Sequence, residues 1–84
     1  MKIVFVDESF EDYNYFATYD KKVFKKLQTL IKDTVKNPFS GLGKPEPLKH
    51  NLAGYWSKRI TKEHRLVYKI EDDMLIIISC RFHY

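Results

Sequence analysis

Residues 64–82, HRLVYKIEDDMLIIISCRF, decide the fold of this chain, because they hold two strand-like runs joined by a short acidic connection. A three-residue loop over residues 71–73 would place Ile70 opposite Met74. One sheet face would then be almost wholly apolar, with Leu66, Tyr68, Ile70, Met74, Ile76, Ile78, Cys80 and Phe82. A two-residue loop would mix polar and apolar residues on both faces, which a half-buried sheet tolerates poorly. We therefore expect the three-residue loop.

The opposite face of this hairpin is predicted to be polar and exposed. Its members are Glu63, Arg65, Ser79, Arg81 and His83. If the preceding hairpin is centred on Lys62, Arg59 joins this face, while Lys58 turns toward the core side near a sheet edge. Phe82 takes a core position in this arrangement, so that His83 and Tyr84, the last two residues of the sequence, are presented on the exposed face.

The rest of the chain predicts a β-α-α-β-β-β order. KIVFV at residues 2–6 is a short strand, residues 7–36 show the spacing of two helices, and Asp20 can cap the second. Residues 37–47 hold all three prolines and two of the three glycines, which indicates an irregular loop. The run GYWSKRI supplies a further strand. We expect an α+β fold, with two N-terminal helices packed on a twisted antiparallel sheet, in a single domain over residues 1–84.

Charge is distributed unevenly along the 84 residues. The formal net charge is +4, but residues 1–19 carry a net −3 and residues 44–69 a net +5. Tyr55, Trp56 and Tyr68 interleave with the basic residues, a combination that suits a polyanion through phosphate contacts and base stacking. A lysine-rich solvated surface explains the charge equally well. The single cysteine, Cys80, and the short apolar stretch at the N-terminus are typical of a cytoplasmic protein without a disulfide, signal peptide or membrane span.

Glu46 stands in the segment KPEPLKH, between two prolines. Pro47 favours an extended conformation at Glu46, and Pro45 fixes its own φ, so the carboxylate is held on a stiff segment. Lys44 and Lys49 would favour its ionised form. Glu46 is thus either a prepositioned general base or a surface glutamate in a proline-rich loop.

A glutamate, an arginine and a histidine on one basic face are what RNA cleavage without a metal requires. A base removes the proton of the 2′-hydroxyl, an acid protonates the departing 5′-oxygen, and guanidinium donors stabilise the charge on the phosphate. Taken singly, each residue has an ordinary explanation, with Glu63 as the salt-bridge partner of Arg65. The sequence has no acidic cluster for magnesium, no phosphate-binding glycine loop and no metal-binding spacing, so we expect no metal or cofactor.

Two segments give the chain a specific resemblance. GKPEPLKHNLAGYWSKRITKEHRLVY (residues 43–68) and CRFHY (residues 80–84), with the opening strand and tyrosine-rich first helix, resemble the YoeB/Txe family of toxins within the RelE superfamily. The similarity runs essentially end to end. It implies a microbial-ribonuclease-like fold and an endoribonuclease of a toxin–antitoxin pair, which cuts messenger RNA at the ribosomal A site.

The resemblance also implies roles for individual residues. Glu46 would be the general base, Arg65 the transition-state stabiliser and His83 the general acid, while Tyr84 would orient or stack on the RNA. Each stands at a matching motif position.

Further substrate positions and partners follow from the same resemblance. Lys49 and Arg59 match basic positions that contact substrate, and Glu63 matches a supporting acidic position. The implied partners are a YefM/Axe-type antitoxin, the ribosome with its messenger RNA, and a second copy of the chain. The alternative function is a translation inhibitor that occupies the same site without cutting, although such a binder would not need a base and an acid together.

Overall fold

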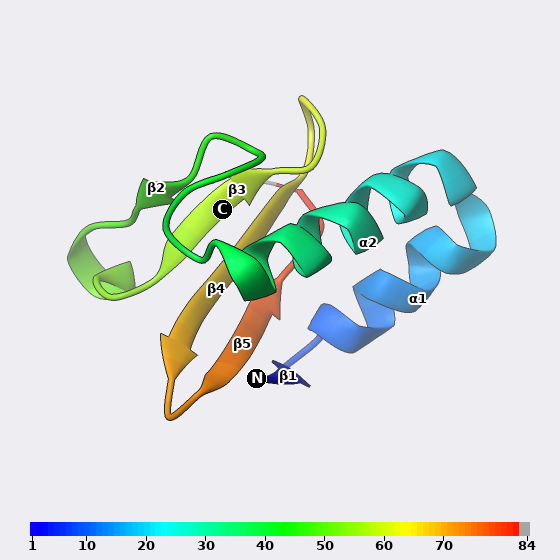
Figure 1. The fold of residues 1–84 in the computed structure, drawn as a ribbon. Coiled ribbons are helices and arrows are strands. Elements are labelled where there is room, and N and C mark those ends of the chain that lie inside the picture. The colour runs from blue at the N-terminus through cyan, green and yellow to red at the C-terminus, as the bar shows by residue number, and fades with distance from the viewer. Residues whose placement is uncertain (83–84) are drawn as a thin grey trace.

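The computed structural model describes residues 1–82, and within them two α-helices lie against five strands (Figure 1). In chain order the elements are β1 (Lys2–Phe5), α1 (Ser9–Tyr19), α2 (Lys21–Lys36), β2 (Glu46–Pro47), the short 3-10 helix η1 (His50–Leu52), β3 (Trp56–Arg59), β4 (Arg65–Glu71) and β5 (Met74–Ser79). The predicted α+β class is confirmed. The additional strand β2 lies inside the stretch that the sequence predicted to be irregular.

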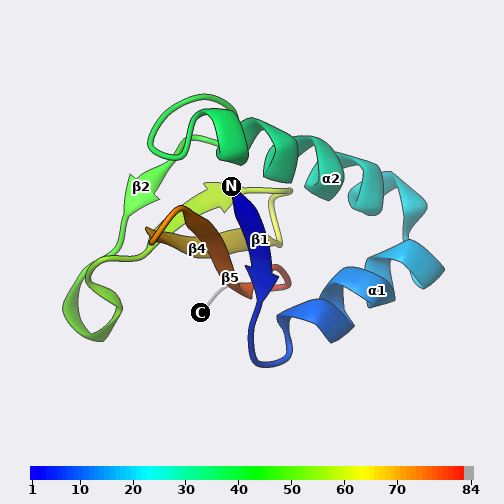
Figure 2. The same ribbon diagram turned by 60° about the horizontal axis from the view of Figure 1, so that its bottom comes forward.

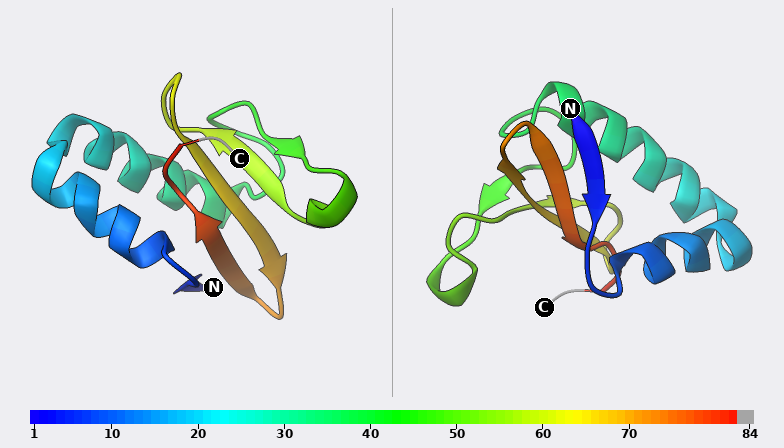
Figure 3. Two further views of the ribbon diagram at one scale, coloured as in Figure 1. Left: turned by 180° about the vertical axis from the view of Figure 1, so that it is seen from behind. Right: turned by 90° about the horizontal axis from the view of Figure 1, so that it is seen from below.

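The five strands form one sheet in the order β1-β5-β4-β3-β2. All neighbours are antiparallel except β1, which is parallel to β5, so the expected antiparallel sheet is wrong at this edge. A parallel pair needs a long crossover connection, which the helices and remaining strands provide here. Both α-helices lie on one face of the sheet (Figures 2 and 3), so within residues 1–82 neither α-helix covers the other face, which we call the helix-free face.

The second helix begins and packs as its sequence predicts. Asp20 caps α2, its carboxylate accepting a hydrogen bond from the Val23 N–H at 3.2 Å. The apolar stripe of α2 enters the core with Leu27, Leu30 and Ile31 buried. No helix within residues 1–82 is long and apolar enough to cross a membrane.

The hairpin between β4 and β5 has a two-residue loop, and the expected three-residue loop is wrong. Asp72 and Asp73 both have positive φ, 48° and 58°, as the preferred two-residue hairpin turn requires. Glu71 therefore pairs with Met74. As a result Leu75 and Ile77 are fully buried, in place of the expected residues on either side of them.

A register shift further along the hairpin returns Cys80 to its predicted face. Tyr68 pairs with Ile77, and the next pair is Val67 with Ser79, so β5 carries one extra residue at this point. The extra residue changes the alternation once more. Cys80 consequently returns to the core, where it has 0% exposure, as the sequence predicted.

Lys58 points to the core side of β3, as expected, but it does not lie at an exposed edge. It has 0% exposure, and its ammonium lies 3.1 Å from the Asp33 carboxylate of α2. A charge can be buried in this way only because a partner of opposite sign is present.

Candidate active site

Glu46 lies on the helix-free face of the sheet. Its Cα is the partner of Ser57 in β3, and directly paired residues project to the same face. Lys58 projects into the core, which assigns Ser57 and Glu46 to the opposite face. The side chain of Glu46 is exposed and forms no ion pair with any other residue of 1–82. Its carboxylate is therefore accessible from solution.

Arg65 lies on the same face as Glu46. It pairs with Arg59 across the β3–β4 hairpin, as predicted, and Arg59 shares the face of Ser57 two residues before it. The Arg65 Nη1 donates to the Thr61 carbonyl at 3.0 Å and, less favourably, to the His64 carbonyl at 3.4 Å. These carbonyls orient the guanidinium without neutralising it, because no carboxylate within the described residues pairs with it.

The remaining predicted substrate residues flank this face at opposite ends of β3. Lys49 is exposed and directly precedes η1, beside the start of β3, whereas Glu63 is exposed in the turn between β3 and β4. The expected salt bridge between Glu63 and Arg65 is not found among residues 1–82. Arg59 is also exposed. Glu46, Arg59 and Arg65 thus share one face, with Lys49 and Glu63 at its borders.

Phe82 lies beside the beginning of β4. Its N–H donates to His64 Nδ1 at 2.8 Å, and its carbonyl accepts from the Arg65 N–H at 3.3 Å. The expected core position of Phe82 is wrong: it is 54% exposed, with a left-handed φ of 61° that turns the chain out of the strand direction. His83 and Tyr84 lie outside the described residues.

Arg81 was predicted on the polar face beside Arg65, but it is held by α1 instead. Its Nη1 lies 3.7 Å from Asp12 Oδ1, and its guanidinium carbon lies 3.6 Å from the centre of the Tyr15 ring. This stacking on an aromatic face fixes the cation away from Glu46. Of Arg65 and Arg81, it is therefore Arg65 that remains available for a substrate phosphate.

Cys80 is chemically inert in this fold. Burial, together with the nearby Asp12 carboxylate, raises the pKa of its thiol to about 12. The thiol therefore stays protonated, and it donates weakly to the Ser9 carbonyl at 3.5 Å. Only the thiolate is a good nucleophile, so a Cys–His mechanism does not suit this site. Among residues 1–82, no group of three or more His, Cys, Asp and Glu side chains could hold a metal ion.

The contact of His64 with Phe82 and the partners of Lys58 were not predicted from the sequence. His64 occurs between Glu63 and Arg65, but its hydrogen bond to Phe82 depends on the register of β5, which the three-residue loop misassigned. The alternation of side chains along β3 did predict that Lys58 faces the core. Nothing in the local pattern identified Asp33, which lies 25 positions earlier, as its partner.

The chain is similar to the same group of known proteins in sequence and in structure. A sequence model of the YoeB-like toxins of bacterial type II toxin–antitoxin systems matches residues 5–84. The toxin YoeB of Escherichia coli strain K12 is 58% identical over the full length of both chains. A solved YoeB/ParE toxin from Agrobacterium tumefaciens has 48% identity and a TM-score of 0.97, with both chains fully covered.

Two structures from Staphylococcus aureus extend the comparison. One is a YoeB–YefM complex and the other a YoeB dimer, with 48% and 49% identity. Each aligns with a TM-score of 0.92 over 100% of this chain and 98% of the other. The fold is thus that of the RelE-related toxins. The chain belongs to the YoeB-like toxins of bacterial type II toxin–antitoxin systems.

Proposed function

We propose that this toxin is a ribosome-dependent endoribonuclease, which cleaves messenger RNA in the A site and thereby inhibits translation. The observation that carries the proposal is the placement of Glu46 and Arg65 on one helix-free face, each without an ion-pair partner in the described chain. A carboxylate and a guanidinium that neutralised each other in an ion pair would be poor catalysts. Here both charges remain available to a substrate.

The proposed reaction is a metal-free transfer within the RNA backbone. Glu46 removes the proton of the 2′-hydroxyl, and the 2′-oxygen attacks the adjacent phosphorus. Arg65 donates hydrogen bonds to the phosphate oxygens as their charge grows. His83 protonates the departing 5′-oxygen. The bond to that oxygen breaks, leaving a 2′,3′-cyclic phosphate and a 5′-hydroxyl.

The other residues bind and orient the RNA in this proposal. Arg59 on this face and Lys49 at its border attract the phosphate backbone, and Glu63 supports the turn that precedes Arg65. Tyr84 offers an aromatic face on which a base can stack. His83 and Tyr84 follow directly after Phe82, whose main chain is bonded to that of Arg65.

The proposed partners follow from the related structures. The S. aureus YoeB–YefM complex supports a YefM-type antitoxin for this chain, and the S. aureus YoeB dimer supports self-association. The ribosome and its messenger RNA are the proposed target, which places the action of the toxin in the cytoplasm.

The test maps the 5′ ends of a defined messenger RNA during translation in vitro. Wild-type protein should produce new ends at A-site codons that carry a 5′-hydroxyl, with the cyclic phosphate or its opened 3′-phosphate on the upstream fragment. Glu46→Gln should reduce the single-turnover rate by about 10²–10⁴-fold, the range for general acid–base groups. Glu11→Gln, at an exposed position of α1, is the matched control and should cleave at the wild-type rate.

Three results would contradict the proposal. A 5′-phosphate with a 3′-hydroxyl would exclude attack by the 2′-oxygen. An unchanged rate in Glu46→Gln would return that residue to an ordinary surface glutamate. Translation arrest without new ends would favour the alternative, a non-cleaving inhibitor bound at the same site.

A further inference from the structure

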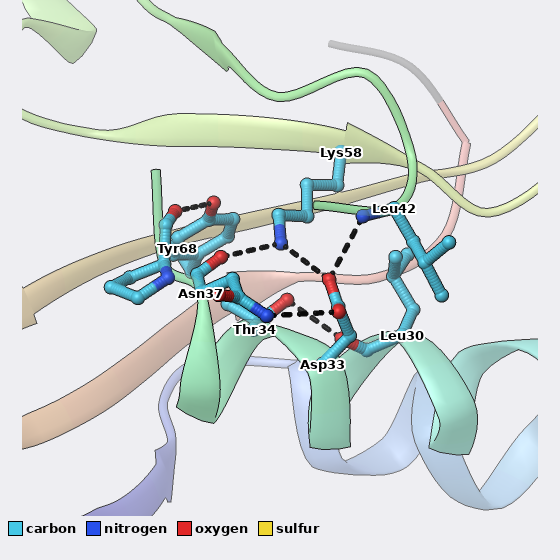
Figure 4. Close-up of polar contacts among 8 residues, drawn as sticks. Leu30, Asp33, Thr34, Asn37, Leu42, Lys58 and Tyr68 are labelled. Carbon is cyan, nitrogen blue, oxygen red and sulfur yellow. Dashed lines mark hydrogen bonds and ion pairs between the residues drawn. The ribbon is translucent and has the colours of Figure 1, made fainter. Parts of the chain in front are cut away.

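Lys58 is a fully buried lysine in the strand that pairs with β2. Its side chain has 0% exposure, and its Nζ donates to Asp33 Oδ2 at 3.1 Å and to the Asn37 carbonyl at 2.9 Å (Figure 4). Burying an ammonium group is costly, and apolar side chains of similar volume often stabilise a core as well as a buried ion pair does. Stability alone does not explain a lysine at this position.

Asp33 extends the contact from the sheet to a loop. Its Oδ2 also accepts a hydrogen bond from the Leu42 N–H at 2.9 Å, and its Oδ1 accepts one from the Asn37 side-chain amide at 3.3 Å. The Leu42 bond, opposed by desolvation and aided by Lys58, holds the pKa of Asp33 below its ordinary value. The Lys58–Asp33 pair therefore connects β3 and α2 with residues 37–43, which we call the anchored loop.

The backbone of the anchored loop packs directly against both members of the pair. Gly41 and Gly43 have φ values of 83° and 81°, in the left-handed region that glycine adopts without strain. A Cβ at Gly41 would lie 2.5 Å from Asp33 Oδ2, and one at Gly43 would lie 2.9 Å from Lys58 Cβ. The Gly43 carbonyl accepts the Arg59 N–H at 2.7 Å. The loop is thus fitted to the pair and to the strand beside it.

The strand that carries Glu46 depends on such support. β2 has only two residues, and the prolines on either side of Glu46 have no N–H to donate. After β2, the Leu48 N–H donates to the Tyr55 carbonyl at 2.9 Å. Before β2, the anchored loop ends at Gly43, three residues from Glu46. These attachments on the two sides fix where the carboxylate is presented.

We propose that the Lys58–Asp33 pair is a positioning device that holds the anchored loop, and through it Glu46 and Arg59, in register with Arg65. Lys58 and Asp33 act from the core side of the sheet, opposite the face that meets the substrate. The inference rests on the proposed function, because it assigns the pair a role in RNA cleavage.

The test replaces both charges together, so that neither is left buried alone. Lys58→Met with Asp33→Asn keeps similar volumes and leaves an amide oxygen for Leu42. Amide hydrogen exchange at Leu42 and Arg59 should accelerate by at least about tenfold, because both N–H groups donate to this assembly. The single-turnover cleavage rate should fall by about 10–100-fold, because a small displacement of a catalytic group slows the chemical step. Affinity for the ribosome should stay within about threefold of the wild-type value.

The matched control is Thr34→Val, which removes a buried hydrogen bond to the Leu30 carbonyl on the same helix and leaves in place the hydrogen bonds that Asp33 and Lys58 make to the anchored loop. It should leave both the exchange at Leu42 and the cleavage rate at wild-type values. If the double variant does not fold, Gly41→Ala provides the same test from the loop side, because its methyl group displaces the loop from Asp33.

The outcomes separate this inference from the proposed function. If the wild-type protein cleaves RNA and the double variant cleaves it at the same rate, only the positioning role is overturned, whether or not amide exchange accelerates. A slower rate without faster exchange at Leu42 would also overturn it, because the loop would not have moved. Absence of cleavage by the wild-type protein would refute the proposed function and the positioning role together.

Discussion

The main-chain N–H of Phe82 donates a hydrogen bond to His64 Nδ1 at 2.8 Å, across 18 positions of the sequence. The Arg65 N–H returns a bond to the Phe82 carbonyl at 3.3 Å. The end of the described chain is thereby joined to the first residue of β4, although β5 itself ends at Ser79. An imidazole nitrogen that accepts a hydrogen bond carries no proton, so His64 is the Nε2–H tautomer in this state.

Replacing His64 by phenylalanine should separate the contribution of the hydrogen-bond acceptor Nδ1 from that of the ring packing. The ring lies 5.0 Å from Phe16 and 5.4 Å from Phe82, and phenylalanine can keep both contacts. Loss of the hydrogen bond from Phe82 should by itself lower the melting temperature by about 4–8 °C. Single-turnover cleavage should fall by about 10–100-fold through displacement of the C-terminal segment. His64→Asn, whose Oδ1 can replace Nδ1 as acceptor, should retain more activity, and wild-type cleavage by His64→Phe would contradict the role.

Arg65→Lys should reduce activity strongly, although the substitution retains the positive charge. Two main-chain carbonyls orient the planar guanidinium, and an ammonium group cannot use them while also meeting a phosphate with two donors. We expect the single-turnover rate to fall by about 10²–10³-fold, as when one transition-state donor is lost. Thermal melting should change little. Lys32→Ala, on the exposed side of α2, is the control for general loss of positive charge.

Cys80 should resist alkylation until the protein unfolds. Burial raises the pKa of its thiol to about 12, so at pH 8 only a minute fraction is thiolate. Iodoacetamide should modify native protein at least about 10³-fold more slowly than protein in guanidinium chloride, which mass spectrometry can follow. Rapid labelling of the native protein would show that the C-terminal end of β5 opens far more readily than the packing around Cys80 indicates.

Acid should weaken the attachment of the anchored loop. The pKa of Asp33 is lower in the folded state than its ordinary value of 3.8, chiefly through the Leu42 N–H, so the unfolded chain binds more protons near pH 4. The contribution of Asp33 to stability is thus complete above about pH 4 and is lost as the pH falls through the lower folded pKa. Between pH 5 and pH 3, wild-type protein should lose more thermal stability than the Lys58→Met, Asp33→Asn variant. Equal losses would contradict this contribution.

The sequence predicts the helices and the β3–β4 hairpin well because local signals define them. An aspartate stands at the start of α2, and one apolar stripe runs along it. The β4–β5 hairpin was harder because two departures from regularity compensate each other. The two-residue turn reverses the expected faces at Leu75, and the extra residue on β5 reverses them again before Cys80. A regular alternation from Met74 to Phe82 could not reveal either departure.

The candidate site was accessible to sequence reasoning wherever neighbouring residues determine geometry. The prolines around Glu46 predicted its extended backbone, and the short turn after Arg59 predicted its pairing with Arg65. The supporting contacts could not be predicted from the sequence, because Lys58 meets Asp33 and Phe82 meets His64 only once the fold is formed.

The prolines beside Glu46 have a consequence for solubility. β2 and β1 are the two edges of the sheet, and an exposed edge can recruit strands from other molecules. At the β2 edge, the three residues 45–47 offer a single main-chain N–H, and the strand is only two residues long. The same local sequence that presents the carboxylate thus also protects this edge of the toxin against aggregation.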